Sequence, residues 1–326
     1  MKKIINTFII IFACILLTSC KNKITEEDFI KTINDLNSYS IEGTMYSLFP
    51  TGEKQSKIVV NYTKPSFYYV EITNPDTNKT QMMIKNNDGV HIIIPSIKKT
   101  FRVESTWPLN STYPYILESL SKELINNENL TQTKENDKTI LQVPIQMFDD
   151  EYTENLKIIL NKDGNLEEVL IYDKDQSLIT RFVVTKFEKN ISINNDIYKV
   201  QETMNYIETS IIPNEFDRSI SYPTYFIEGT YKISEVIRNL NDNTYAVINY
   251  GGSDYYTIVE TYVDEHTVIP TYYEGNLFLY GGTITVVAEN YILFYDNGIE
   301  YKLASDTVPT YELIKMGESL TVISEK

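Results

Sequence analysis

Few side chains in this sequence are of a type that performs catalysis, and they lie far apart. The chain has two histidines, His91 among apolar residues and His266 directly after Asp264-Glu265. We expect His91 to be a half-buried strand residue and His266 to lie in a solvated turn. No GxSxG, HExxH, Walker or GxGxxG pattern occurs, so neither an activated nucleophile nor a phosphate-binding loop is indicated. The sequence predicts a protein that is not an enzyme and uses no cofactor.

One acidic run has side chains that could bind a metal ion. Asp149, Asp150, Glu151 and Glu154 place four carboxylates within six residues, and calcium prefers hard oxygen ligands of this kind. The run lacks the alternating spacing and the central glycine of a calcium loop. The pattern favours the alternative, a solvated acidic loop, and we predict no metal site.

Cys20 has the most specific chemical context in the chain. An apolar run covers residues 4–17 after two lysines, and Leu17-Thr18-Ser19-Cys20 ends it. This resembles the lipobox of bacterial lipoproteins, whose cysteine carries a diacylglyceryl group and becomes the first residue after cleavage. The run is too short to span roughly 30 Å of hydrocarbon, so residues 1–19 are predicted to be a signal peptide. The alternative is an ordinary secretory signal with a chance cysteine.

Charge and cysteine content restrict the function further. The formal net charge is −16, which disfavours binding to nucleic acid and to anionic lipid headgroups. The other cysteine, Cys14, lies in the predicted signal peptide, which leaves no disulfide and no thiolate metal site. A diacylglyceryl group on Cys20 would hold the protein at the outer face of the cell membrane, with residues 20–27 as the lipidated cysteine and a short tether.

β-branched and aromatic residues, including 26 tyrosines, favour a strand-rich fold. Residues 25–36 predict a capped amphipathic helix. From residue 40 the apolar period becomes two, which predicts a meander of short antiparallel strands up to residue 105. A second helix is predicted over residues 112–126, and more strands follow, the last of them over residues 200–206.

The pattern predicts two folded units of the α+β class, with a boundary near residue 213. Residues 28–212 are expected to form one large curved antiparallel sheet, a half-barrel that helices cover. Residues 213–326 are expected to form a smaller antiparallel sheet that ends in a helix over residues 309–320.

The larger unit resembles a known family. A helix, a meander, the run DGVHIIIPSIKKTF at residues 88–101, a second helix and further strands are similar to the LolA-like lipoprotein-carrier superfamily. The resemblance implies a half-open barrel whose apolar concave face is covered by helices. The carriers of that family are soluble shuttles, and the lipobox of this chain departs from them.

The carboxy-terminal unit shows a second resemblance. The run YILFYDNG at residues 291–298, Tyr301-Lys302-Leu303 and the final helix look like an uncharacterised domain that follows LolA-like domains in lipoproteins of Gram-positive, often spore-forming bacteria. Such lipoproteins act in sporulation and germination, and one activates a spore-cortex amidase by binding it. A related architecture occurs in periplasmic regulators that bind an anti-sigma factor. A fold does not determine a function, so the implied role of binding and regulation is an expectation.

The concave face of the first sheet is the predicted apolar cavity or interface. Strand alternation aims eight side chains at one side of the sheet, and a tryptophan lies in the loop before the second helix. These residues are Ile58, Val60, Tyr62, Tyr68, Val70, Ile72, Ile92, Ile94 and Trp107. Either the helices fill this face and it is simply core, or a pocket stays open for an acyl chain or for a partner's hydrophobic side chains.

Together these features predict a non-enzymatic lipoprotein that binds and regulates a partner protein in the cell envelope, during sporulation or germination. The alternative is a lipid-binding or lipoprotein-handling module that uses the cavity of the half-barrel. The tyrosine-rich strands would also permit pairing between a sheet edge and a partner.

Overall fold

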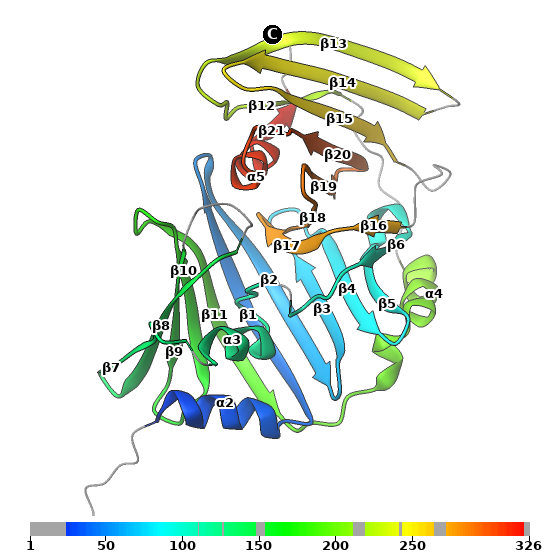
Figure 1. Cartoon of the computed structure of the whole chain (residues 1–326). Coiled ribbons are helices and arrows are strands. Elements are labelled where there is room, and N and C mark those ends of the chain that lie inside the picture. Colours follow the sequence, from blue (N-terminus) through cyan, green and yellow to red (C-terminus); the bar gives the residue numbers. More distant parts are fainter. Residues whose placement is uncertain are drawn as a thin grey trace, which may run out of the picture.

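The computed structural model describes residues 24–109, 111–125, 127–147, 154–210, 219–240, 243–263 and 272–322. The predicted signal peptide, Cys20, residues 149–151, His266 and the predicted boundary near residue 213 lie outside these ranges. Within them the chain forms two large β-sheets accompanied by a few helices (Figure 1). The predicted class, α+β and rich in strands, is confirmed.

The first sheet has twelve strands in the described part of the chain. In spatial order they are β16 (Tyr272–Glu274), β6 (Lys99–Glu104), β5 (Gly89–Ile94), β4 (Thr80–Asn86), β3 (Phe67–Thr73), β2 (Gly52–Thr63), β1 (Ser38–Phe49), β11 (Leu178–Lys189), β10 (Leu166–Tyr172), β9 (Glu154–Leu160), β8 (Lys138–Ile145) and β7 (Thr131–Glu135). The strands from β1 to β11 pair antiparallel with their neighbours, as the alternating pattern predicts. β16 pairs parallel with β6.

The centre of this sheet is its longest hairpin, β1 with β2, and it is strongly curved. Ile41 lies opposite Val60 and both are fully buried. A register shift follows Glu42 where β1 meets β11, and there the ring of Phe182 lies where a side chain of Gly43 would be. A β-bulge increases the local twist of a sheet, so this position helps the sheet to bend around its core.

Two helices cover the concave face (Figure 1). α2 (Glu26–Asp35) begins at a capping box, in which the Thr25 hydroxyl accepts from the backbone N–H of Asp28 and the Asp28 carboxylate accepts from the backbone N–H of Thr25. Phe29 and Ile33 are its buried residues. α3 (Leu117–Leu124) packs against α2 and points Leu117, Leu120 and Leu124 into the same core.

The predicted strand over residues 200–206 is wrong, because this segment belongs to helix α4 (Val200–Ser210). Val200, Met204 and Ile207 recur at helical spacing and pack on the convex face of β4 and β5 against Met82, Ile84 and Ile93. The short helices η2 (Pro95–Ile97) and η3 (Asn195–Tyr198) flank these elements. α4 therefore covers the side of the sheet that faces away from α2 and α3.

The second sheet has seven strands among the described residues. In spatial order they are β13 (Thr230–Leu240), β14 (Asn243–Gly252), β15 (Tyr256–Tyr262), β20 (Ile299–Ala304), β19 (Tyr291–Asp296), β18 (Thr283–Val287) and β17 (Asn276–Tyr280). α5 (Thr310–Glu318) packs on β19 and β20 with Leu313, Ile314 and Met316 buried. A small ribbon of β12 (Ser221–Pro223) and β21 (Leu320–Val322) lies beside α5.

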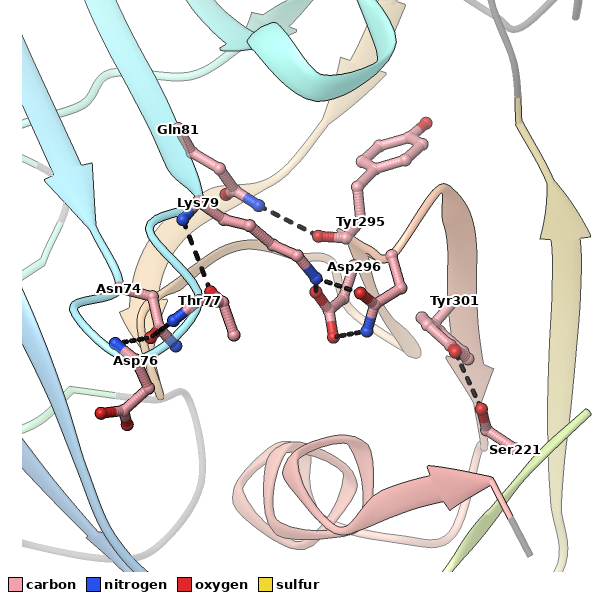
Figure 2. A network of polar contacts seen from close by, with 10 residues as sticks. Asn74, Asp76, Thr77, Lys79, Gln81, Ser221, Tyr295, Asp296 and Tyr301 are labelled. Atoms are coloured by element: carbon pink, nitrogen blue, oxygen red, sulfur yellow. Dashed lines mark hydrogen bonds and ion pairs between the residues drawn. The ribbon is translucent and has the colours of Figure 1, made fainter. Parts of the chain in front are cut away.

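Polar side chains of the first sheet bind the second sheet directly, as Figure 2 shows. Lys79 bonds to the side chains of Asp296 and Asn297 from the turn between β3 and β4, a turn that the Asn74 side chain closes. The Gln81 amide donates to the Tyr295 carbonyl at 3.0 Å and accepts from the backbone N–H of Ile284 at 2.8 Å.

A charged pair and aromatic packing join the first sheet and the loop before α3 to the second sheet and α5. Lys54 of β2 bonds to the Glu318 carboxylate at 2.5 Å. The rings of Phe101 and Tyr295 stack at 4.6 Å, and Tyr113 contacts Phe278 at 6.1 Å between ring centroids. Buried residues of both sheets consequently belong to one continuous hydrophobic core.

Candidate protein-binding surface

The nine residues of the predicted apolar cavity or interface come together in the core. Ile58, Val60, Tyr62, Tyr68, Val70, Ile72, Ile92, Ile94 and Trp107 are each between 0% and 4% exposed. They belong to the core cluster that also contains the buried faces of α2 and α3. In this conformation they are not available to a partner, and an acyl chain would have to separate packed side chains. Their role as a cavity or an interface stays a prediction.

Trp107 is the largest fully buried side chain of the described residues. Its ring meets the rings of Tyr68 at 5.5 Å and Tyr113 at 6.1 Å, both in edge-on arrangements. The Lys85 ammonium donates to the Trp107 carbonyl. The loop before α3 therefore carries a tryptophan that fixes the loop to the sheet.

The carboxylic acid Glu118 lies in the first turn of α3 and is partly buried. It accepts a hydrogen bond of 2.7 Å from the Tyr39 hydroxyl, and burial raises its pKa above the ordinary value. Burial and the nearby charge of Glu118 raise the pKa of Tyr39 and Tyr68. The three side chains form one hydrogen-bonded cluster.

The other residues considered for chemistry occupy ordinary positions. His91 lies on β5, half-buried as predicted, and burial lowers its pKa. The Glu154 carboxylate accepts from the backbone N–H of Met147 at 3.2 Å. No group of three or more potential ligands is close enough to hold a metal ion in the ranges that the structure describes.

The surface that stands out is an exposed apolar area on the second sheet. Tyr231, Ile233, Val236 and Tyr255 are between 39% and 64% exposed, and we call these four residues the β13 patch. β13 is an edge strand of the sheet, and Figure 1 shows it at the end of the molecule opposite α2. Isolated exposed apolar residues are normal, whereas a cluster of them marks an interaction site.

Local backbone features create the β13 patch. A register shift between Lys232 and Ser234 leaves Ile233 in a bulge opposite β14. Ile233 and Tyr255 then lie over Gly251, with side-chain atoms 2.4 and 2.9 Å from where a Cβ atom would be. At Gly252 the Gly229 carbonyl oxygen lies 2.2 Å from where a Cβ atom would be, and the ring of Tyr231 lies at 3.2 Å. The two glycines allow large apolar side chains to gather on an exposed face.

Sequence reasoning predicts a strand over residues 231–237 but not its exposed patch. One signal in the sequence is that apolar residues occupy both odd and even positions of this strand, at Tyr231, Ile233, Val236 and Ile237. A strand that contains a bulge allows this departure from alternation. The Gly251-Gly252 pair is a second signal, because strand glycines mark close approach.

The fold and surface thus define a β-rich protein of two packed sheets with an exposed apolar edge. No family model matches the chain. It is 22% identical over 340 residues to the sporulation protein YdcC of Bacillus subtilis strain 168, a match that covers 100% of both chains. No helix in the described ranges is long and apolar enough to cross a membrane.

Solved structures give three further similarities. The complex of Pseudomonas aeruginosa MucA and MucB matches over 91% of this chain and 100% of the other, with 13% identity and a TM-score of 0.34. A LolA superfamily protein of Nitrosomonas europaea matches over 55% and 99%, with 10% identity and a TM-score of 0.32. A chain from the complex of the CwlD amidase and the GerS lipoprotein of Clostridioides difficile matches over 53% and 97%, with 20% identity and a TM-score of 0.28. The sequence match over the whole chain confirms the predicted resemblance to a sporulation protein, and a LolA superfamily protein is among the solved structures to which the chain is similar.

Proposed function

We propose that this protein is a non-enzymatic lipoprotein that binds and regulates a partner protein at the outer face of the cell membrane during sporulation. The observation that carries the proposal is the β13 patch, in which the exposed Tyr231, Ile233 and Tyr255 gather around Gly251 and Gly252 and the exposed Val236 lies further along β13. Aromatic residues on a protein surface are enriched where partners bind. The whole-length similarity to a sporulation protein supports the biological setting.

The patch suits a partner that offers apolar side chains or an extended strand. β13 pairs with β14 on one side, and its other side pairs with no strand among the described residues. Backbone N–H and C=O groups on such an edge can pair with an added strand, while the neighbouring side chains contribute specificity. A cortex amidase, the example that the sequence resemblance implies, is the class of partner that we propose.

The first prediction concerns capture of this partner. Replacing Tyr231 and Ile233 together by serine is expected to reduce recovery of a stoichiometric envelope protein from solubilised membranes by about fivefold or more, because buried aromatic anchors dominate interface energies. Recovery is measured by affinity purification of the tagged, full-length protein from sporulating cells, followed by quantitative mass spectrometry.

A matched control separates binding from general surface hydrophobicity. Leu109 and Ile125 are each 48% exposed and lie in the larger unit, so the double variant Leu109→Ser with Ile125→Ser removes a comparable exposed apolar surface elsewhere. We expect this control to recover the partner as the wild type does. Equal recovery by both double variants would contradict the proposed role of the β13 patch.

The second prediction concerns the anchor. Cys20→Ala is expected to move the protein from the membrane fraction to the soluble fraction, because only a thiol can accept the diacylglyceryl group that provides membrane affinity. The measurement is fractionation of cells followed by immunoblotting, with Cys14→Ala as the control that leaves the lipobox intact. Unchanged membrane attachment of the Cys20 variant would exclude the lipid anchor.

A further inference from the structure

A large groove lies on the second sheet, and its residues come from three separate turns. Its volume is about 1170 Å³, above the range of roughly 300–1,000 Å³ that is usual for small-molecule pockets. One wall is the turn from β16 to β17 at residues 274–276, and another is the turn from β18 to β19 at residues 287–291. Residues 305–310, which lead into α5, form the third wall, and Met147, which follows β8, also lines the groove.

The groove has an apolar floor and an acidic rim. Met147, Phe278, Val287 and Val308 line it with side chains that are at most 8% exposed. Glu274, Glu289 and Asp306 also line it and are exposed, whereas no lysine, arginine or histidine is among its described lining residues. The side chains therefore favour a ligand that combines apolar groups with positive charge.

The three carboxylates are distributed along the groove. In the described ranges no three potential metal ligands converge, so these acids do not share one point-like cation. Tyr291 and Glu274 both line the groove. Burial raises the pKa of Tyr291, and the charge of the Glu274 carboxylate raises it further. Asp306 accepts a hydrogen bond of 3.1 Å from the Asn290 amide at another part of the rim. Separated charges match an elongated ligand with several positive groups.

Other charges near the groove do not reverse this preference. The amino-terminal end of α5 contributes only about half a positive charge, and Glu312 already lies in the first turn of that helix. Lys302 lies over the ring of Tyr291 at 4.1 Å from its centroid, and it is not a lining residue. Three negative side chains consequently outweigh the positive end of the helix.

From this arrangement we infer that the groove binds an extended, lysine- or arginine-bearing segment of a partner protein, with alternate apolar side chains on the floor at Phe278 and Val308. The inference deepens the proposed function, and rests on it, because it assigns a basic segment to the partner that the β13 patch binds. The strongly acidic chain, with a formal net charge of −16, would also attract such a segment from a distance.

The test uses a defined probe with the full chain in detergent. The probe is a fluorescein-labelled peptide of alternating lysine and valine, and its counterpart has glutamate in place of lysine. Fluorescence anisotropy is expected to show binding of the lysine peptide only, with weaker binding as salt rises and screens the charges. The triple variant Glu274→Gln, Glu289→Gln and Asp306→Asn is expected to raise the Kd by about tenfold.

A control with the same change of net charge makes the result specific. Glu128, Asp163 and Asp175 are exposed in the larger unit, and their triple change to Gln, Asn and Asn is expected to raise the Kd less than about twofold. Equal effects of the two triple variants, or no binding of the lysine peptide, would overturn the inference. Ala288→Trp, which narrows the groove without changing charge, should weaken binding as well, and unchanged affinity would overturn the inference.

Failure of this inference and failure of the proposed function give different results. The double variant of the β13 patch could lower partner recovery from membranes while the triple variant of the groove does not. This result would overturn the groove as the partner's site, and the proposed function would stand. Probe binding that depends on the groove, without recovery of any envelope protein, would support the groove as a basic-peptide site and contradict the proposed function.

Discussion

Replacing Trp107 by alanine is expected to lower the free energy of unfolding by about 3–5 kcal/mol, because a fully buried indole leaves a cavity that its neighbours fill only in part. The ring is 0% exposed and packs edge-on against Tyr68 and Tyr113. The indole Nε1 atom has no hydrogen-bond partner among the described residues, so the expected loss arises from packing. Equilibrium unfolding in urea, followed by fluorescence and circular dichroism, measures it.

Leu109 provides a control in the same loop. It lies two residues away and is 48% exposed, so Leu109→Ala is expected to change the free energy of unfolding by no more than about 0.5 kcal/mol. If Trp107→Ala cost less than about 1 kcal/mol, the side chain would not be the anchor between the loop and the sheet that its contacts indicate.

Removing the buried carboxylic acid Glu260 is expected to change how stability depends on pH. The side chain is on β15, is 0% exposed, and accepts hydrogen bonds of 3.1 and 3.2 Å from the backbone N–H of Ser221. Burial raises its pKa to about 7, although the bond from Ser221 acts in the opposite direction, and the charge of Glu235 raises the pKa further. The Ser221 hydroxyl bonds to the Tyr301 hydroxyl at 2.9 Å (Figure 2).

The sign of the effect follows from proton binding. Between the ordinary pKa of 4.5 and the folded value of about 7, the folded chain holds a proton on Glu260 that the unfolded chain has released. The free energy of unfolding therefore falls as the pH rises through this window, by about 3 kcal/mol in total, and this contribution is constant above it. Glu260→Gln keeps a neutral acceptor for Ser221 and should abolish this contribution to the pH dependence.

Urea unfolding at about pH 5 and about pH 8 tests this prediction. The variant is expected to be more stable than the wild type at the higher pH and similar to it at the lower pH. Glu118 and Glu318 also have raised pKa values because of burial, but they are present in both proteins and cancel in the difference. Parallel pH profiles for wild type and variant would show that folding does not raise the pKa of Glu260.

Much of the fold could be predicted because its signals are local. The capping box at Thr25 and Asp28 is visible within four residues of sequence, and the alternation of Ile58, Val60 and Tyr62 identifies one face of β2. The same alternation predicts that the nine apolar residues share a face. It does not predict how completely α2 and α3 cover them, because coverage depends on contacts between distant segments.

The surface features could not be predicted, because they also depend on contacts between distant segments. Exposure of Tyr231 and Ile233 follows from the place of β13 at the edge of its sheet and from the bulge opposite β14. The groove combines Glu274, Glu289 and Asp306 from separate turns. Their spacing in the sequence does not predict that they line the same groove. The segment 200–206 predicts a strand because Val200, Met204 and Tyr206 share one parity, and only the packing partners of Ile207 show that the face is helical.

The pairing of β16 with β6 has a consequence for the order in which the chain is made. Residues 272–274 complete a sheet whose other strands all precede residue 190. During synthesis the hydrogen-bonding edge of β6 therefore stays unpaired until residues 272–274 have been made. An uncovered edge is a template for strands of other chains. A shortened form ending at the predicted boundary near residue 213 would keep that edge open permanently and would be prone to self-association.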